Sequence, residues 1–154
     1  MPKLEIENLE EFKKMVGKAL PIGEWLEVTQ DMVNAFARAT LDFQWIHIDV
    51  ERAKKESPFK APIAHGFMSV SLLSKMLEDS IIIKSVKMGV NYGLNKVRFP
   101  HPVVVGSRLR FVGQINSVED YGENGVKTVW GCTVEIEDVE KPACVGEFVT
   151  LTFE

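Results

Sequence analysis

Two stretches near the start of the chain have the apolar spacing of amphipathic helices. Apolar residues recur every three or four positions over Asn8–Val16 and again over Thr29–Thr40. The first residue of each range is a type that caps helix N-termini, and Gly17 is a suitable end for the first helix. The spacing breaks down over Leu41–His47, so we expect an irregular loop there.

A third helix is predicted over Phe67–Leu77, and its pattern differs from that of the first two. Lys75 is its only charged residue, and apolar or small residues occupy every face. This pattern is typical of a helix buried on nearly all sides. The two prolines of the preceding segment, Ser57–His65, favour an ordered loop that is not helical throughout.

The second half of the chain is rich in β-branched and aromatic residues, separated by turn-forming residues. In one segment, apolar and polar residues alternate, which predicts a sheet with one buried face. Helices followed by an antiparallel sheet indicate one α+β domain over residues 1–154, with the sheet wrapped on the apolar helix. The predicted strands are Val86–Phe99, Arg108–Val118, Val126–Ile136 and Ala143–Phe153.

Size, charge and cysteine usage exclude several functions. The chain has 154 residues and a net charge of −4, so it has room for one core and no basic field for nucleic acid or an anionic membrane. Cys132 and Cys144 have neither metal-site spacing nor a disulfide framework, which favours a reducing compartment. With no secretion signal and no stretch of roughly 18 apolar residues, we expect a soluble, cytoplasmic protein.

Candidate catalytic groups gather between residues 42 and 66. Asp42 and His47 would point about 140° apart on a helix, so they converge only if the segment between them is irregular. A carboxylate and an imidazole that share a water molecule can add it to a polarised double bond. Gly66 opens the apolar helix, and its free N–H could donate to a carbonyl oxygen of a ligand and so form an oxyanion site.

Structural explanations compete with each of these. An isolated Asp-x4-His pair is common, and Asp42 has the alternative of capping a turn. A histidine placed before a helix, as His65 is, more often has a structural role than a catalytic one. His101 lies between two prolines, which is typical of a surface loop. The acidic and histidine side chains here lack any recurring metal-ligand spacing, so we expect no metal.

Two separated motifs resemble one known family. Ala39–Ala53 (ATLDFQWIHIDVERA) and Phe59–Met68 (FKAPIAHGFM) resemble the hydratase motif of the MaoC-like, (R)-specific enoyl-CoA hydratases. Asn91–Phe99 (NYGLNKVRF) resembles the branch of that family typified by nodulation protein N. The motifs occur in the family's order and spacing, and the resemblance extends from the Thr29 helix to the last strand.

The resemblance implies a hot-dog fold, in which an antiparallel sheet wraps a long helix. It also implies a homodimer or higher homo-oligomer that binds acyl-CoA near the subunit interface, as in fatty acid metabolism. By position, Asp42 and His47 match the family's catalytic pair, and Gly66 matches the glycine that polarises the thioester carbonyl. Ser74 matches a serine that supports the active site, and His65 matches a histidine to which we give a structural role.

The expected reaction is syn addition of water to a trans-2-enoyl-CoA, giving an (R)-3-hydroxyacyl-CoA, with no cofactor besides the CoA thioester substrate. Which of the pair is the base and which the acid stays open. The family's usual Gly-Asp-x-Asn-Pro-x-His is replaced here by Leu41–His47, with Trp45 inside it. We expect Trp45 to shorten or reshape the acyl pocket.

Two other functions remain compatible with the sequence. Other hot-dog proteins hydrolyse thioesters, and that reaction needs water aimed at the carbonyl carbon instead of C3. A non-catalytic module that binds acyl-CoA or an acylated carrier protein is the third possibility. The joint presence of Asp42, His47, Gly66 and Ser74 favours hydration, and the acyl chain length stays open.

Overall fold

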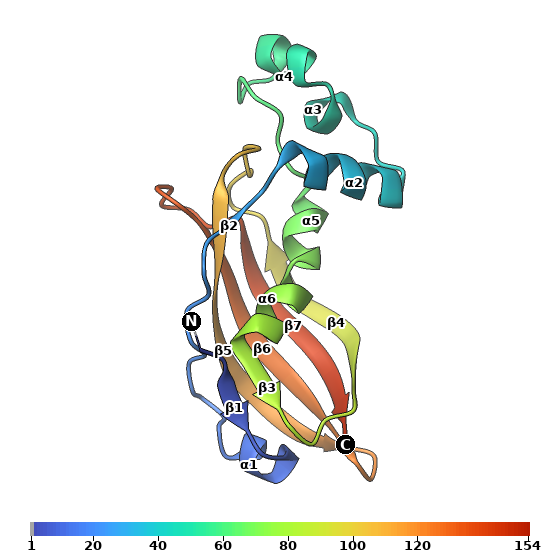
Figure 1. Ribbon diagram of the computed structural model, residues 1–154, viewed down its shortest axis with the longest axis vertical. Helices are drawn as coiled ribbons and strands as arrows, with labels where there is room; N and C mark the ends of the chain where they lie inside the picture. The colour runs from blue at the N-terminus through green and yellow to red at the C-terminus, as the bar shows by residue number, and fades with distance from the viewer. Residues whose placement is uncertain (1) are drawn as a thin grey trace.

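The computed structural model describes residues 2–154 and has a long curved sheet with helices inside it and at one end (Figure 1). The sheet is antiparallel, with the strand order β2-β5-β6-β7-β4. This arrangement confirms the predicted α+β class. The strands are β2 (Leu26–Glu27), β4 (Met88–Arg98), β5 (Arg108–Tyr121), β6 (Gly125–Ile136) and β7 (Cys144–Phe153).

The four predicted strands all form, within a few residues of their expected bounds. Along β6 the alternation is the one that the sequence indicates, since every second side chain from Val126 to Ile136 is buried. These side chains face α5 (Gly66–Ser71) and α6 (Leu73–Ser80), which run along the inside of the sheet (Figure 1). Burial of this face against the helices supplies the apolar core.

The helix predicted over Phe67–Leu77 forms as α5 and α6, joined at Leu72, but it is not buried on nearly all sides. Met68, Leu73 and Met76 pack into the core. The opposite side is exposed, and Phe67 has 72% of its surface open to solvent. The prediction was wrong on this point because small and apolar residues mark an unpaired face as readily as a buried one.

The first predicted helix forms over fewer residues than the predicted range, Asn8–Val16. Helix α1 is Leu9–Lys13, and Asn8 caps it by accepting the Glu11 N–H at 2.9 Å. The carboxylate of Glu11 does not complete a capping box; it pairs with Lys14 at 3.0 Å. Past the helix, the Gly17 N–H binds the Ile115 carbonyl, which ties the chain to β5.

The end of the molecule beyond the sheet carries three helices, shown at the top of Figure 1. Helix α2 is Gln30–Thr40, as predicted, and the Thr29 hydroxyl caps it. The short helices α3 (Trp45–Ile48) and α4 (Val50–Glu56) follow. The pattern did not predict α3, α4 or the parallel pair of β1 (Leu4–Ile6) and β3 (Ile81–Ile83), because each is too short to show a period.

Two further findings concern the cysteine thiols and the helices. Burial raises the pKa of the Cys132 thiol to about 12 and that of Cys144 to about 11, so neither is a reactive thiolate near neutral pH. Across residues 2–154, the helices are too short or too polar to cross a membrane.

Candidate active site

Asp42 is positioned by the end of helix α2. Leu41 ends that helix in the left-handed conformation, with φ of 62°, and so turns the chain away from the helix axis. Asp42 follows directly, and its carboxylate accepts the Gln44 N–H at 3.3 Å. The side chain is 51% exposed, so the carboxylate is available to a ligand.

His47 lies in α3 and is only 6% exposed. Its Nδ1 is 2.6 Å from the carbonyl oxygen of Ile63, in the loop before α5. A carbonyl accepts only from an N–H, so Nδ1 carries the proton and Nε2 keeps its lone pair. The Gln30 amide holds the main chain by donating to the His47 carbonyl at 2.8 Å.

The electrostatics of His47 favour the neutral ring. Burial lowers the pKa of His47 below its usual value, and neighbouring His65 lowers that pKa further. The bond to the Ile63 carbonyl and the charge of Asp42 act in the opposite direction. His47 is therefore a buried imidazole with an unprotonated Nε2, which is the state that a general base needs.

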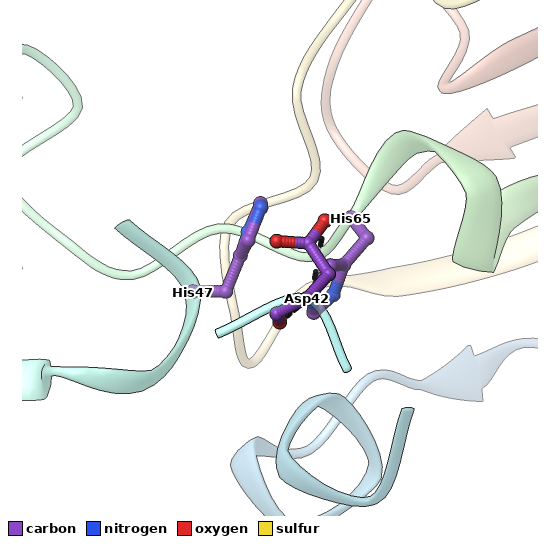
Figure 2. Close-up of side chains that lie close together, drawn as sticks. All are labelled: Asp42, His47 and His65. Carbon is purple, nitrogen blue, oxygen red and sulfur yellow. Dashed lines mark hydrogen bonds and ion pairs between the residues drawn. The ribbon is translucent and has the colours of Figure 1, made fainter. Parts of the chain in front are cut away.

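His65 joins the pair from a third segment, just before α5, as Figure 2 shows. Its Nε2 donates to the main-chain oxygen of Asp42 at 3.1 Å and lies 3.9 Å from the Asp42 carboxylate. Its ring stacks on that of His47, with the centroids 3.8 Å apart. The irregular turn thus brings Asp42 and His47 together, and His65 contacts both.

Gly66 and His47 line the same small hollow, of about 240 Å³. As the first residue of α5, Gly66 has no acceptor for its N–H within the helix, and no residue of 2–154 accepts it elsewhere. A Cβ at Gly66 would lie 3.0 Å from the ring of Phe99, so a larger residue would displace that ring. A carbonyl group in the hollow could therefore approach this N–H closely.

The structure does not bring Ser74 to this group. Ser74 is eight residues beyond Gly66, about 12 Å along the helix at 1.5 Å per residue, on the exposed side of α6. It lines two further hollows between the helices and β4, of about 370 and 500 Å³. Trp45 lines neither of these nor the hollow at His47; it packs under Arg52, at 4.2 Å from the guanidinium carbon to the ring centroid.

Asp42, His47 and His65 also include metal-ligand types, with one possible ligand atom from each lying within 4.8 Å of the others. However, His47 Nδ1 and His65 Nε2 each bond to a main-chain carbonyl. The remaining nitrogen of His65, Nδ1, is buried and has no partner among the described residues. The arrangement is that of a hydrogen-bonded cluster, and the absence of a catalytic metal stays a prediction.

Comparison with known proteins identifies the family. The MaoC like domain matches residues 11–135, which is most of the chain. This protein therefore belongs to the MaoC-like family.

Curated relatives match along nearly their whole length. The chain is 46% identical over 143 residues to 3-hydroxyacyl-thioester dehydratase Z of Mycobacterium tuberculosis, covering 93% of this chain and 94% of the relative. It is 40% identical over 145 residues to nodulation protein N of Rhizobium leguminosarum, covering 94% and 90%. These matches agree with the family and branch indicated by the sequence motifs.

Solved structures with the same fold include two distant relatives. A monoamine oxidase regulatory protein of Archaeoglobus fulgius has a TM-score of 0.77 at 23% identity, covering 100% of this chain and 99% of that one. The (R)-hydratase from A. caviae has a TM-score of 0.68, also at 23% identity, covering 88% and 94%. Both likenesses bear on the hot-dog fold alone.

Sequence reasoning missed two contributors to the site. Gln30, at the start of α2, carries no chemical signature, and nothing in its spacing to His47 shows that the two residues meet. For His65 the sequence predicts a structural role, but it gives no sign of the contact with Asp42, which spans 23 positions in sequence. A motif gives residue types in order, whereas these contacts depend on how three segments fold back on one another.

Proposed function

We propose that this chain is an (R)-specific 3-hydroxyacyl-thioester dehydratase that adds water reversibly to trans-2-enoyl-CoA, with Asp42 and His47 as its catalytic pair. The observation that carries this proposal is the juxtaposition of an exposed carboxylate with a buried, neutral imidazole beside a free N–H at Gly66. The family membership and the relative from Mycobacterium tuberculosis, which is named a 3-hydroxyacyl-thioester dehydratase, support the same reaction.

His47 is the better candidate for the group that moves the proton. In hydration, Nε2 of His47 takes one proton from the water as the oxygen bonds to C3, and it then returns that proton to C2. Asp42 orients the water by accepting its other O–H, which the product keeps as its hydroxyl. The thioester oxygen gains negative charge in the enolate-like state, and the Gly66 N–H stabilises that charge.

The hollows along α5 and α6 suggest a path for the acyl chain. With the thioester carbonyl at Gly66, a chain that extends along the helix passes Ser74 and reaches the hollow of about 500 Å³ beneath Trp130 and Phe148. The walls of this hollow are largely apolar, as an acyl chain requires. We therefore propose Ser74 as a residue of the substrate path and not as a partner of the catalytic pair.

The experiment is an assay with purified protein and a series of trans-2-enoyl-CoA substrates of increasing chain length. Loss of enoyl-thioester absorbance, with a product of R configuration at C3, is the expected result. Release of free CoA thiol without loss of the double bond would instead indicate a thioesterase. Binding of saturated acyl-CoA without turnover of any enoyl-CoA would indicate a binding module, and either outcome would overturn the proposal.

We also propose that the protein forms a homodimer through strand β4. Among residues 2–154 this strand pairs only with β7, so its outer edge has main-chain groups without a partner there. Met88, Val90 and Tyr92 on it are 54%, 41% and 57% exposed. A mass measurement in solution should give twice the 17.3 kDa of one chain or a multiple of that, and Tyr92→Lys should shift it toward one chain.

A further inference from the structure

His65 touches both members of the proposed catalytic pair, and it does so through different atoms. Its Nε2–H bonds to the main-chain oxygen of Asp42 at 3.1 Å, at the turn that aims the Asp42 carboxylate. The flat side of its ring lies against His47, with 24° between the ring planes. Phe36 of α2 covers the ring from another direction, at 4.9 Å between centroids.

We propose that His65 is a positioning residue: it fixes the turn that carries Asp42 relative to the ring of His47, so that one water molecule can reach both. This inference rests on the proposed function. It goes beyond a space-filling role, because the hydrogen bond holds the Asp42 main chain while the stacked ring limits how His47 can tilt. Without the hydrogen bond and the ring contact, His65 would no longer link the segment that carries Asp42 to the ring of His47.

The buried side of His65 indicates which ring nitrogen carries the proton that is donated to Asp42. Nδ1 is buried and has no partner among the described residues, and the whole side chain is 3% exposed. A proton on Nδ1 would be a buried N–H without an acceptor, so the ring donates through Nε2. The ionisable groups that face the ring are Asp42 and His47.

Two substitutions separate the hydrogen bond from the bulk of the side chain. In His65→Gln the amide N–H₂ falls near the position of Nε2 and can still donate to the Asp42 carbonyl. In His65→Asn the amide falls near Nδ1, where no acceptor is available. Both variants lose the ring and bury an amide group, and they differ in whether that group reaches the Asp42 carbonyl, so they form a matched pair.

The test compares kcat and KM of the two variants for one reactive trans-2-enoyl-CoA, with the melting temperature measured for each. We expect kcat of His65→Gln to stay within about tenfold of the wild type and kcat of His65→Asn to fall at least about tenfold further, because misplacement by about 1 Å costs on the order of a hundredfold. We expect KM to change by less than about threefold in both.

Equal kcat values for the two variants would overturn the proposal, whether both are active or both inactive, and so would a loss confined to KM. Asp42→Asn in the same assay tells a failure of the His65 proposal from a failure of the proposed function. If Asp42→Asn were fully active, Asp42 would not be catalytic and the proposed function itself would be wrong. A measurement on the wild-type protein guards against variants that do not fold. The ¹⁵N shifts of His65 should place the donated proton at Nε2, and a ring that carries its proton on Nδ1 alone would overturn the proposal.

Discussion

The sheet and the helical end of this molecule are held together in different ways. Strands β5, β6 and β7 form continuous antiparallel ladders, and side chains such as Phe111, Ile115 and Val134 are 1% exposed or less. The segments around the site depend more on single polar contacts. The carbonyl groups of His47, Ile63 and Asp42 each accept one of these side-chain bonds.

This difference indicates that stability and catalysis are largely separable here. Apolar burial scales with the area removed from water, and most of the buried apolar residues belong to the sheet and the helices against it. A few hydrogen bonds contribute little to the free energy of unfolding, yet they determine where Asp42 and His47 point. Substitutions in the sheet should therefore lower the free energy of unfolding with little effect on kcat. Substitutions around the site should lower kcat with little effect on the free energy of unfolding.

The largest expected effect is on stability, from a change beneath the sheet. Phe12 is fully buried and packs on Trp130, with the ring centroids 5.5 Å apart. Phe12→Ala should lower the free energy of unfolding by about 3–5 kcal/mol, measured by denaturant titration. The kcat of the folded protein should stay close to the wild-type value, and a parallel loss of kcat would show that the two regions are not separable.

Among changes that leave Asp42 and His47 in place, the largest effect on the reaction comes from Gly66, with little change in stability. Gly66→Ala should lower kcat by about a hundredfold, by analogy with the loss of one oxyanion donor, because the added methyl group intrudes beside the free N–H. Steady-state kinetics test this, with the melting temperature as a check on folding. The double variant with Phe99→Leu removes the ring that the methyl group would strike, and full recovery of kcat in it would assign the loss to that ring.

A smaller effect is expected from loss of the hydrogen bond between the Gln30 amide and the His47 carbonyl. Gln30→Ala removes the donor to the His47 carbonyl and should lower kcat by about tenfold through misplacement of the ring. Asn34→Ala is the matched control, because Asn34 accepts from the same amide at 2.9 Å but does not touch His47. Equal kcat values for the two variants would mean that the hydrogen bond from Gln30 does not position His47.

The smallest expected effect is the pH dependence that follows from His47. Its pKa is lower in the folded protein than its usual value of about 6.5. Between the two values the unfolded chain binds more protons, so the free energy of unfolding should fall as the pH drops below about 6.5. Because the base must be neutral, the acid limb of kcat/KM should lie below pH 6.5, and a limb above that value would contradict the role of His47.

Much of this molecule was predictable from local pattern. The four long strands and helix α2 follow from periodicity and capping, since each is long enough to repeat its signal. Gly66 and the Asp42–His47 pair follow from the motif. The exposed side of α5 and α6 was not predictable, because the same small and apolar residues occur on buried helix faces and on exposed ones.

The support of the proposed catalytic pair was the least predictable part. Gln30 and His65 reach His47 and Asp42 across 17 and 23 positions in sequence, through main-chain oxygens that every residue has. Trp45 shows the opposite case. It lies within the motif and was expected to shape the acyl pocket, yet it packs beneath Arg52, away from the hollows along the helices.

The most direct test of the central claim is the rate of hydration of one trans-2-enoyl-CoA at saturation, compared between the wild type and Asp42→Asn. The substitution keeps the size of the side chain and its bond to the Gln44 N–H while removing the charge that orients water. The expected result is a loss of kcat on the order of a thousandfold with an unchanged melting temperature. An Asp42→Asn variant that hydrates the substrate at the wild-type rate would contradict the assignment of the reaction to this pair.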